Sequence, residues 1–132
     1  MVPYSDGVRI LCDRASFLSG CGRNYTSQFG EDGLIEVALE EFGAVNRWCF
    51  EVGAADGILL SNTHRLRGFG WRAVLIEGDE KNFAELEKQK SHTTFCVHEK
   101  IGRESLDRIL KECGAPVDLD FGSIDIDGQD IY

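Results

Sequence analysis

The sequence contains few prolines and few basic residues. Its 132 residues include 2 prolines and 14 Lys plus Arg, against 23 Asp plus Glu, so the formal net charge is −9 at pH 7. Such a chain repels nucleic-acid phosphates and anionic lipid headgroups, and we expect neither nucleic acid nor a membrane surface as a partner. With 42% hydrophobic residues, the composition also excludes a disordered chain and collagen-like repetition.

Long apolar runs and paired cysteines are missing as well. No stretch approaches the ~20 apolar residues of a membrane span, and the start carries neither a cationic leader nor an apolar run of signal-peptide length. We therefore expect a cytoplasmic protein. The cysteines are odd in number and form no CxxC pair and no zinc-binding spacing, so we expect no metal site and buried free thiols at Cys49, Cys96 and Cys113.

Helical and strand patterns alternate from residue 28 onward, after an irregular or partly helical lead-in over 1–27. Four strands, apolar on both faces, are predicted at 48–52, 73–76, 93–97 and 119–126. Helices are predicted at 34–42, 61–67, after the N-cap Asp79, and at 106–113. Because such strands must be covered on both sides, the pattern predicts one domain over 28–132, an α/β three-layer sandwich with a mostly parallel sheet.

Glycines and carboxylates gather where the predicted strands end. In open α/β sheets ligands bind outside the carboxyl ends of the strands, which makes these positions the candidate site. Glu77 follows Gly53 by 24 residues, close to the ~20-residue offset at which a carboxylate accepts hydrogen bonds from a ribose diol. The alternative is that Gly53 and Gly57 serve a tight turn and that Glu77 is a solvated charge.

The turn after the first strand favours one class of nucleoside over another. Its spacing is Gly-x-x-x-Gly, with Ala55 where a dinucleotide-binding turn has its second glycine. Glu51 and Asp56 would repel a pyrophosphate, but they suit the sulfonium and ammonium groups of S-adenosylmethionine. The residues therefore indicate S-adenosylmethionine as the cofactor and disfavour NAD.

Six segments together carry a family resemblance. They are YTSQFGEDG (25–33), WCFEVGAADG (48–57), LSNT (60–63), GW (70–71), VLIEGD (74–79) and SIDIDG (123–128). In this order, over residues 24–132, the chain resembles the N-terminal, cofactor-binding part of the FkbM-type class I S-adenosylmethionine-dependent methyltransferases. The resemblance implies a Rossmann-like methyltransferase fold, here truncated after the fourth strand.

The resemblance also implies roles for individual residues. A first cofactor motif surrounds Gly53, Glu77 holds the ribose hydroxyls, and Asp125 makes methionine-side or acceptor-side contacts. The implied cofactor-binding set is Glu51, Gly53, Ala54, Asp56, Gly57, Glu77, Gly78 and Asp125. Asp127 is the candidate catalytic base or acceptor orienter, and the implied reaction is O-methylation of a sugar or another small-molecule hydroxyl.

Several alternatives stay open at this stage. One alternative is that the domain is a catalytically silent S-adenosylmethionine-binding or interaction module. A more remote alternative is a fragment of a haloacid-dehalogenase-type phosphatase, whose first motif would be Asp125-x-Asp127-Gly128. The acidic residues Glu31 and Asp32, with Gln28, either close over the cofactor or favour a helix N-terminus. Asn62 is expected to bond to nearby backbone.

The edge of the fourth strand is a further point of interest. In the family order this strand is interior, so a sheet that stops there leaves the edge of 119–126 unpaired. An apolar edge strand is an association site. We therefore expect either a homodimer through this edge or a fragment of a longer protein.

Overall fold

The structure is a computed structural model that describes Gly22, Ser27 and residues 30–125. The lead-in expected over 1–27 is thus covered at two positions only, and Asp127 lies outside the described residues. The elements in chain order are α2 (Glu31–Phe42), β1 (Trp48–Val52), α3 (His64–Gly68), β2 (Arg72–Glu77), α4 (Glu80–Leu86), the 3-10 helix η2 (Glu87–Gln89), β3 (Thr94–His98), α5 (Ser105–Glu112) and β4 (Phe121–Ile124).

The four strands form one open sheet in the order β3-β2-β1-β4, and all pairs are parallel. In the register, Cys49 of β1 lies beside Ala73 of β2 and Phe121 of β4. Every residue of β1 is buried except Phe50, which is half-buried. In β2, every residue after Arg72 is buried. The predicted α/β class with a parallel sheet is confirmed, and this topology is compatible with a Rossmann-like fold.

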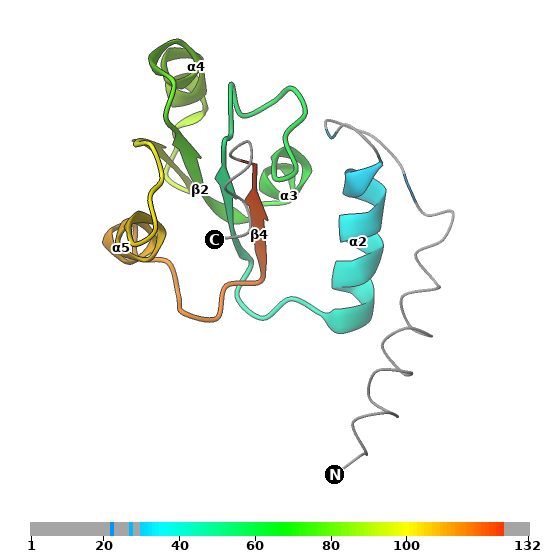
Figure 1. Ribbon diagram of the computed structural model, residues 1–132. Helices are drawn as coiled ribbons and strands as arrows, with labels where there is room; N and C mark the ends of the chain where they lie inside the picture. Colours follow the sequence, from blue (N-terminus) through cyan, green and yellow to red (C-terminus); the bar gives the residue numbers. More distant parts are fainter. Residues whose placement is uncertain (1–21, 23–26, 28–29, 126–132) are drawn as a thin grey trace.

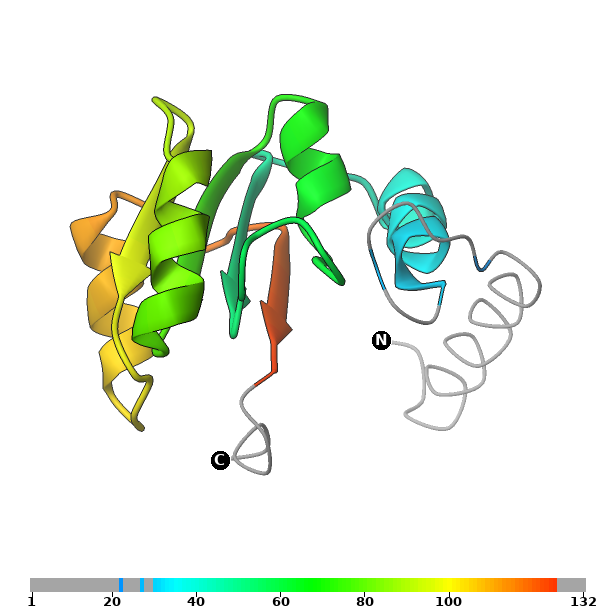
Figure 2. The ribbon, with the colours of Figure 1, turned by 90° about the horizontal axis from the view of Figure 1, so that it is seen from above.

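Helices cover both faces of the sheet (Figures 1 and 2). One core cluster joins Cys49, Ala73 and Leu75 of the sheet to side chains of α2, α3 and α4, and it includes Trp71. The other joins sheet residues such as Val74 to α5. The alternation of side chains along each strand therefore supplies two apolar layers, one on each side of the sheet.

The predicted element ends agree with the structure at two caps. Gly43, at φ 81°, closes α2 and donates its N–H to Leu39 O over 2.8 Å. The Asp79 side chain accepts a hydrogen bond from the Asn82 N–H over 2.9 Å and so caps α4. Both ends follow from local chemistry, because glycine tolerates the left-handed region and a short carboxylate satisfies the first free N–H groups of a helix.

Two predicted elements are longer than the observed ones. The helix expected from residue 61 begins only at His64, because the Ser61 and Thr63 hydroxyls donate to Glu51. The strand expected over 119–126 is Phe121–Ile124 in the described part of the chain. None of the described helices is both long and apolar enough to cross a lipid bilayer.

The described cysteines are free thiols of unequal exposure. Cys49 is fully buried, as predicted, whereas Cys96 and Cys113 are only half-buried. Burial raises the pKa of Cys49, the Arg67 charge lowers it and the Glu51 charge raises it, and the net pKa is about 12. A thiol with so high a pKa stays protonated and unreactive at neutral pH.

Candidate functional site

A cavity of about 690 Å³ lies at the carboxyl ends of β1, β2 and β4. We call it the strand-end cavity. Its lining residues are Val52, Gly53, Ala55, Ile76, Glu77, Gly78, Asp79, Asn82, Glu99, Lys100, Ile101 and Asp125. Four of the residues predicted to bind a cofactor are among them: Gly53, Glu77, Gly78 and Asp125. The sheet thus brings Gly53 and Asp125, which are 72 positions apart in the chain, to one cavity.

Gly53 begins the turn after β1 in a left-handed conformation, with φ 75°. Its N–H and that of Ala54 both donate to Ile76 O, over 2.9 and 3.1 Å. A Cβ atom placed on Gly53 would lie 2.0 Å from the main-chain oxygen of Asp125. Glycine is therefore required here by the close approach of the chain after β4, in addition to the positive φ.

Glu77 ends β2 and holds the same turn from the other side. Its Oε2 accepts a hydrogen bond from the Ala55 N–H over 2.7 Å, and its Oε1 accepts one from the Asp79 N–H over 2.9 Å. Ala55 has φ 49°, which is uncommon for a residue with a Cβ. The carboxylate is thus fixed at the cavity wall and is not a freely solvated charge.

Glu51 lies elsewhere, on the α3 side of the sheet, and it does not line the strand-end cavity. Only 4% of this residue is exposed. Its carboxylate accepts hydrogen bonds from the Ser61 and Thr63 hydroxyls, each over 2.7 Å, and from the Asn62 N–H over 2.9 Å. Three donors satisfy this buried charge. Their hydrogen bonds connect the loop before α3 to β1.

The remaining residues of the predicted cofactor motif shape the turn without lining the cavity. Ala54 is 2% exposed and belongs to the core. The Asp56 side chain accepts hydrogen bonds from the N–H groups of Ile58 and Leu59, both over 2.9 Å. Gly57 has φ 76°, and a Cβ atom on it would lie 2.7 Å from Leu86 Cδ1, so its positive φ and the packing of α4 both favour glycine there.

Two polar side chains near the α3 segment make contacts that the sequence did not predict: Arg67, which sequence reasoning missed, and Asn62. The Arg67 guanidinium donates to the Gly57 carbonyl; burial lowers its pKa, against the raising effect of Glu51. The Asn62 side chain was expected to bond locally, but its Nδ2 donates to Ser123 Oγ of β4 over 3.1 Å. Neither contact has a sequence signal, because each partner lies on a different element.

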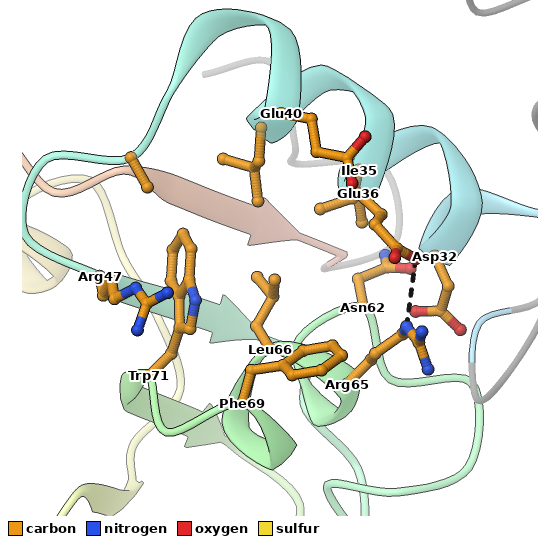
Figure 3. A pocket seen from close by; sticks show the side chains of 12 residues that line it. Asp32, Ile35, Glu36, Glu40, Arg47, Asn62, Arg65, Leu66, Phe69 and Trp71 are labelled. Carbon is orange, nitrogen blue, oxygen red and sulfur yellow. Dashed lines mark hydrogen bonds and ion pairs between the residues drawn. The ribbon is translucent and has the colours of Figure 1, made fainter.

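A second hollow, which we call the helix groove, lies between α2 and the α3 segment (Figure 3). Its volume is about 510 Å³, and it is lined by Asp32, Ile35, Glu36, Leu39, Glu40, Ala44, Arg47, Asn62, Arg65, Leu66, Phe69 and Trp71. Asp32, predicted either to close over the cofactor or to favour the helix N-terminus, lines this groove and not the strand-end cavity. It exchanges hydrogen bonds with Ser27, whose N–H donates to Oδ2 over 2.9 Å and whose Oγ accepts from the Asp32 N–H over 3.0 Å.

The lining of the strand-end cavity combines carboxylates with one lysine, one asparagine and apolar side chains. Within residues 30–125 and the two isolated described positions, no three His, Cys, Asp or Glu side chains are grouped to hold a metal ion. Comparison of the chain with protein families, with curated proteins and with solved structures finds no match.

Proposed function

We propose that this domain binds S-adenosylmethionine in the strand-end cavity and serves methyl transfer to a hydroxyl group of a sugar or another small molecule. The observation that carries the proposal is the placement of Glu77, a fixed carboxylate at the end of β2, on the wall of a cavity that begins at the Gly53 turn. A carboxylate at this point of an open parallel sheet is suited to a ribose diol.

The hydrogen bonds that Glu77 already makes leave capacity for this role. Each carboxylate oxygen has two lone pairs, and each accepts one main-chain N–H, from Ala55 or from Asp79. The remaining lone pairs can accept the two ribose hydroxyls. Because the backbone bonds orient the carboxylate beforehand, little entropy is lost when a ligand binds.

The charge of the cavity supports a cationic ligand over a pyrophosphate. Four of its lining residues are acidic, namely Glu77, Asp79, Glu99 and Asp125, and Lys100 is the one basic residue among them. Glu99 is paired with Arg108, which leaves three carboxylates against one ammonium group. This excess favours the sulfonium and amino groups of S-adenosylmethionine and disfavours the phosphates of NAD.

When bound, S-adenosylmethionine supplies an electrophilic methyl group on its sulfonium. Among the described residues, Glu77 would hold the ribose and Asp125 would face the ammonium end. Gly78 allows the close approach of Lys100, whose Cα would lie 3.2 Å from a Cβ atom placed on Gly78. The base or acceptor orienter is assigned to Asp127 by the family resemblance alone. A base near the acceptor is needed because a hydroxyl must lose its proton as the new bond forms.

Calorimetric titration tests the proposal directly. S-adenosylmethionine and S-adenosylhomocysteine should bind more tightly than NAD. Glu77→Gln should weaken binding about tenfold, the effect of losing a hydrogen bond to a charged group. Glu80→Gln, an exposed residue of α4 outside the cavity, is the matched control and should leave the affinity unchanged.

Two results would contradict the assignment. Tighter binding of NAD would show that the acidic cavity does not select against phosphates. Unchanged affinity in a folded Glu77→Gln protein would place the ligand elsewhere. Transfer of a labelled methyl group to hydroxyl acceptors separates an enzyme from a silent binding module, because the silent module would bind S-adenosylmethionine without transferring the label.

A further inference from the structure

The helix groove is separate from the strand-end cavity, and the two share no lining residue. Its floor is apolar, formed by Ile35 and Leu39 of α2 and, across from them, by Leu66, Phe69 and Trp71. At about 510 Å³ it falls in the range of small-molecule sites, roughly 300–1,000 Å³. Phe69 is 57% exposed, so part of this apolar surface is open to solvent.

One wall of the helix groove carries negative charge. Asp32, Glu36 and Glu40 stand four residues apart on α2, and all three line the groove. Residues at this spacing lie on one face of a helix, one turn above another. On the side opposite to α2, Arg65 is the cation nearest to this wall, and its Nε lies 3.3 Å from Glu36 Oε2 (Figure 3). Arg47 lies toward the far end, near Trp71.

Arg65 indicates how this groove holds a cation. Its guanidinium carbon lies 5.1 Å from the centre of the Phe69 ring, while its Nε is paired with Glu36. A positive group is therefore held between a carboxylate and an aromatic face, an arrangement that attracts cations through charge and through the ring quadrupole. Glu40 lies one turn farther along α2. The salt bridges within the part of the chain that the structure describes all involve other acids.

We propose that the helix groove binds a small amphiphilic organic cation, with an apolar body and an ammonium group. The body packs against Leu39, Leu66 and Phe69, and the ammonium lies beside the carboxylates of α2, as the Arg65 guanidinium does. The groove lining carries three carboxylates, those of Asp32, Glu36 and Glu40, against the two guanidinium groups of Arg47 and Arg65. A ligand with the same body and a carboxylate in place of the ammonium is disfavoured by this excess of negative charge and by the formal net charge of −9. This site is independent of the proposed methyltransferase function.

The test compares 4-phenylbutylamine with 4-phenylbutyrate, which share the body and differ in the sign of the charge. In titrations followed by calorimetry and by NMR, the amine should bind about tenfold more tightly, with amide shifts at Leu39 and Phe69 but not at Gly53 or Gly78. Leu39→Phe, which fills the groove, should weaken amine binding at least about tenfold. Phe69→Leu, at an exposed position, removes the ring face without disturbing the core, and it should also weaken amine binding.

A charge variant and its matched control complete the experiment. Glu40→Gln should weaken amine binding about threefold, whereas Glu41→Gln, exposed on the same helix but outside the groove, should leave it unchanged. Equal binding of amine and carboxylate, equal effects of the two glutamate variants, or no amine binding at millimolar concentration would overturn the proposal. Two further results would also overturn the proposal. Self-association of the protein that Leu39→Glu abolishes would assign the groove to a second copy of the chain. Amide shifts at Gly53 or Gly78 on titration with the amine would place the amine in the strand-end cavity.

Discussion

Glu77 Oε2 accepts a hydrogen bond from the main-chain N–H of Ala55 over 2.7 Å, and this bond joins the end of β2 to the turn that follows β1. The same carboxylate accepts the Asp79 N–H at the start of α4. One side chain therefore shapes the strand-end cavity and faces it at the same time. Its structural role and its proposed binding role must be separated by measuring stability and affinity on the same variants.

The first prediction concerns this double role of Glu77. Glu77→Ala should lower the free energy of unfolding by about 1–3 kcal/mol, because the Ala55 N–H loses its acceptor in a partly buried turn. Glu77→Gln keeps an acceptor oxygen and should cost less. Urea unfolding monitored by circular dichroism measures both. Equal stability of Glu77→Ala and the unaltered protein would show that the turn does not depend on this bond.

The second prediction uses two glycines with nearly the same φ. Gly53 has φ 75° and Gly43 has φ 81°, but a Cβ atom on Gly53 would lie 2.0 Å from Asp125 O, whereas one on Gly43 would meet nothing within 4 Å. Gly43, with φ 81° and ψ 164°, lies in a backbone region that residues with a Cβ rarely adopt, so Gly43→Ala should cost about 1–3 kcal/mol of strain alone. Gly53→Ala adds a clash with main chain and should cost more than about 4 kcal/mol, in the range of exceptional single mutations.

The position of the clash at Gly53 also predicts which part of the fold a substitution there disturbs. Because the obstructing atom belongs to the chain after β4, the substitution should disturb the β1–β4 pairing itself. Thermal unfolding of both alanine variants is the measurement, and equal losses of stability in the two would contradict the geometric argument.

The parts of the fold that could be predicted from the sequence are those with local causes. The apolar runs of β1 and β2 exclude most alternatives to buried parallel strands, and Gly43 and Asp79 mark helix ends through their own backbone preferences. Glu77 lies at the carboxyl end of β2 and lines the strand-end cavity, and its position at the end of a strand is also local. Rules of this kind depend only on neighbours in the chain.

The role of Glu51 could not be predicted in the same way. It was assigned to the cofactor, but its carboxylate is used by Ser61, Asn62 and Thr63. Those donors come from a loop whose path is set by tertiary packing, and no periodicity reveals which hydroxyl will face which strand. The same holds for the helix groove, whose walls come from residues about 30 positions apart in the chain.

The third prediction tests the Glu51 network. Thr63→Val removes one hydroxyl from a fully buried position with little change of shape, and it should lower the free energy of unfolding by about 1–3 kcal/mol. Thr93→Val, a partly exposed position in the turn before β3, is the matched control and should change stability by no more than about 0.5 kcal/mol. Chemical unfolding of the two variants gives the comparison.

The fourth prediction concerns the outer edge of β4. In the described part of the chain β4 pairs with β1 alone, and Ile124 on this strand is 41% exposed. An edge strand without a neighbour can pair with another copy. We expect a homodimer through this edge, and light scattering over a concentration series should show the mass of two chains. Ile124→Lys should shift the mass toward one chain, and a monomer at high micromolar concentration in the unaltered protein would contradict the expectation.

The fifth prediction concerns pH and the carboxylate of Asp120. Slight burial raises the pKa of Asp120, but the hydrogen bonds that it accepts from the N–H groups of Val45, Asn46 and Arg47 lower it, and the net pKa lies below the ordinary value. A group whose pKa is lower in the folded state stabilises the fold fully above its unfolded pKa, about 3.9 for Asp. That stabilisation is lost as the pH falls through the folded pKa.

Asp120→Asn should therefore be less stable than the unaltered protein at pH 7, and the difference should shrink as the pH falls below about 4. The control is Asp107→Asn, which removes a solvent-exposed ion pair with Lys111 and should change stability by no more than about 0.5 kcal/mol. Urea unfolding at several pH values from 7 downward supplies the curves. A difference between Asp120→Asn and the unaltered protein that is independent of pH would show that the three N–H groups bind the neutral acid form of Asp120 as well as its carboxylate, which would contradict the charge-dependent role assigned to Asp120.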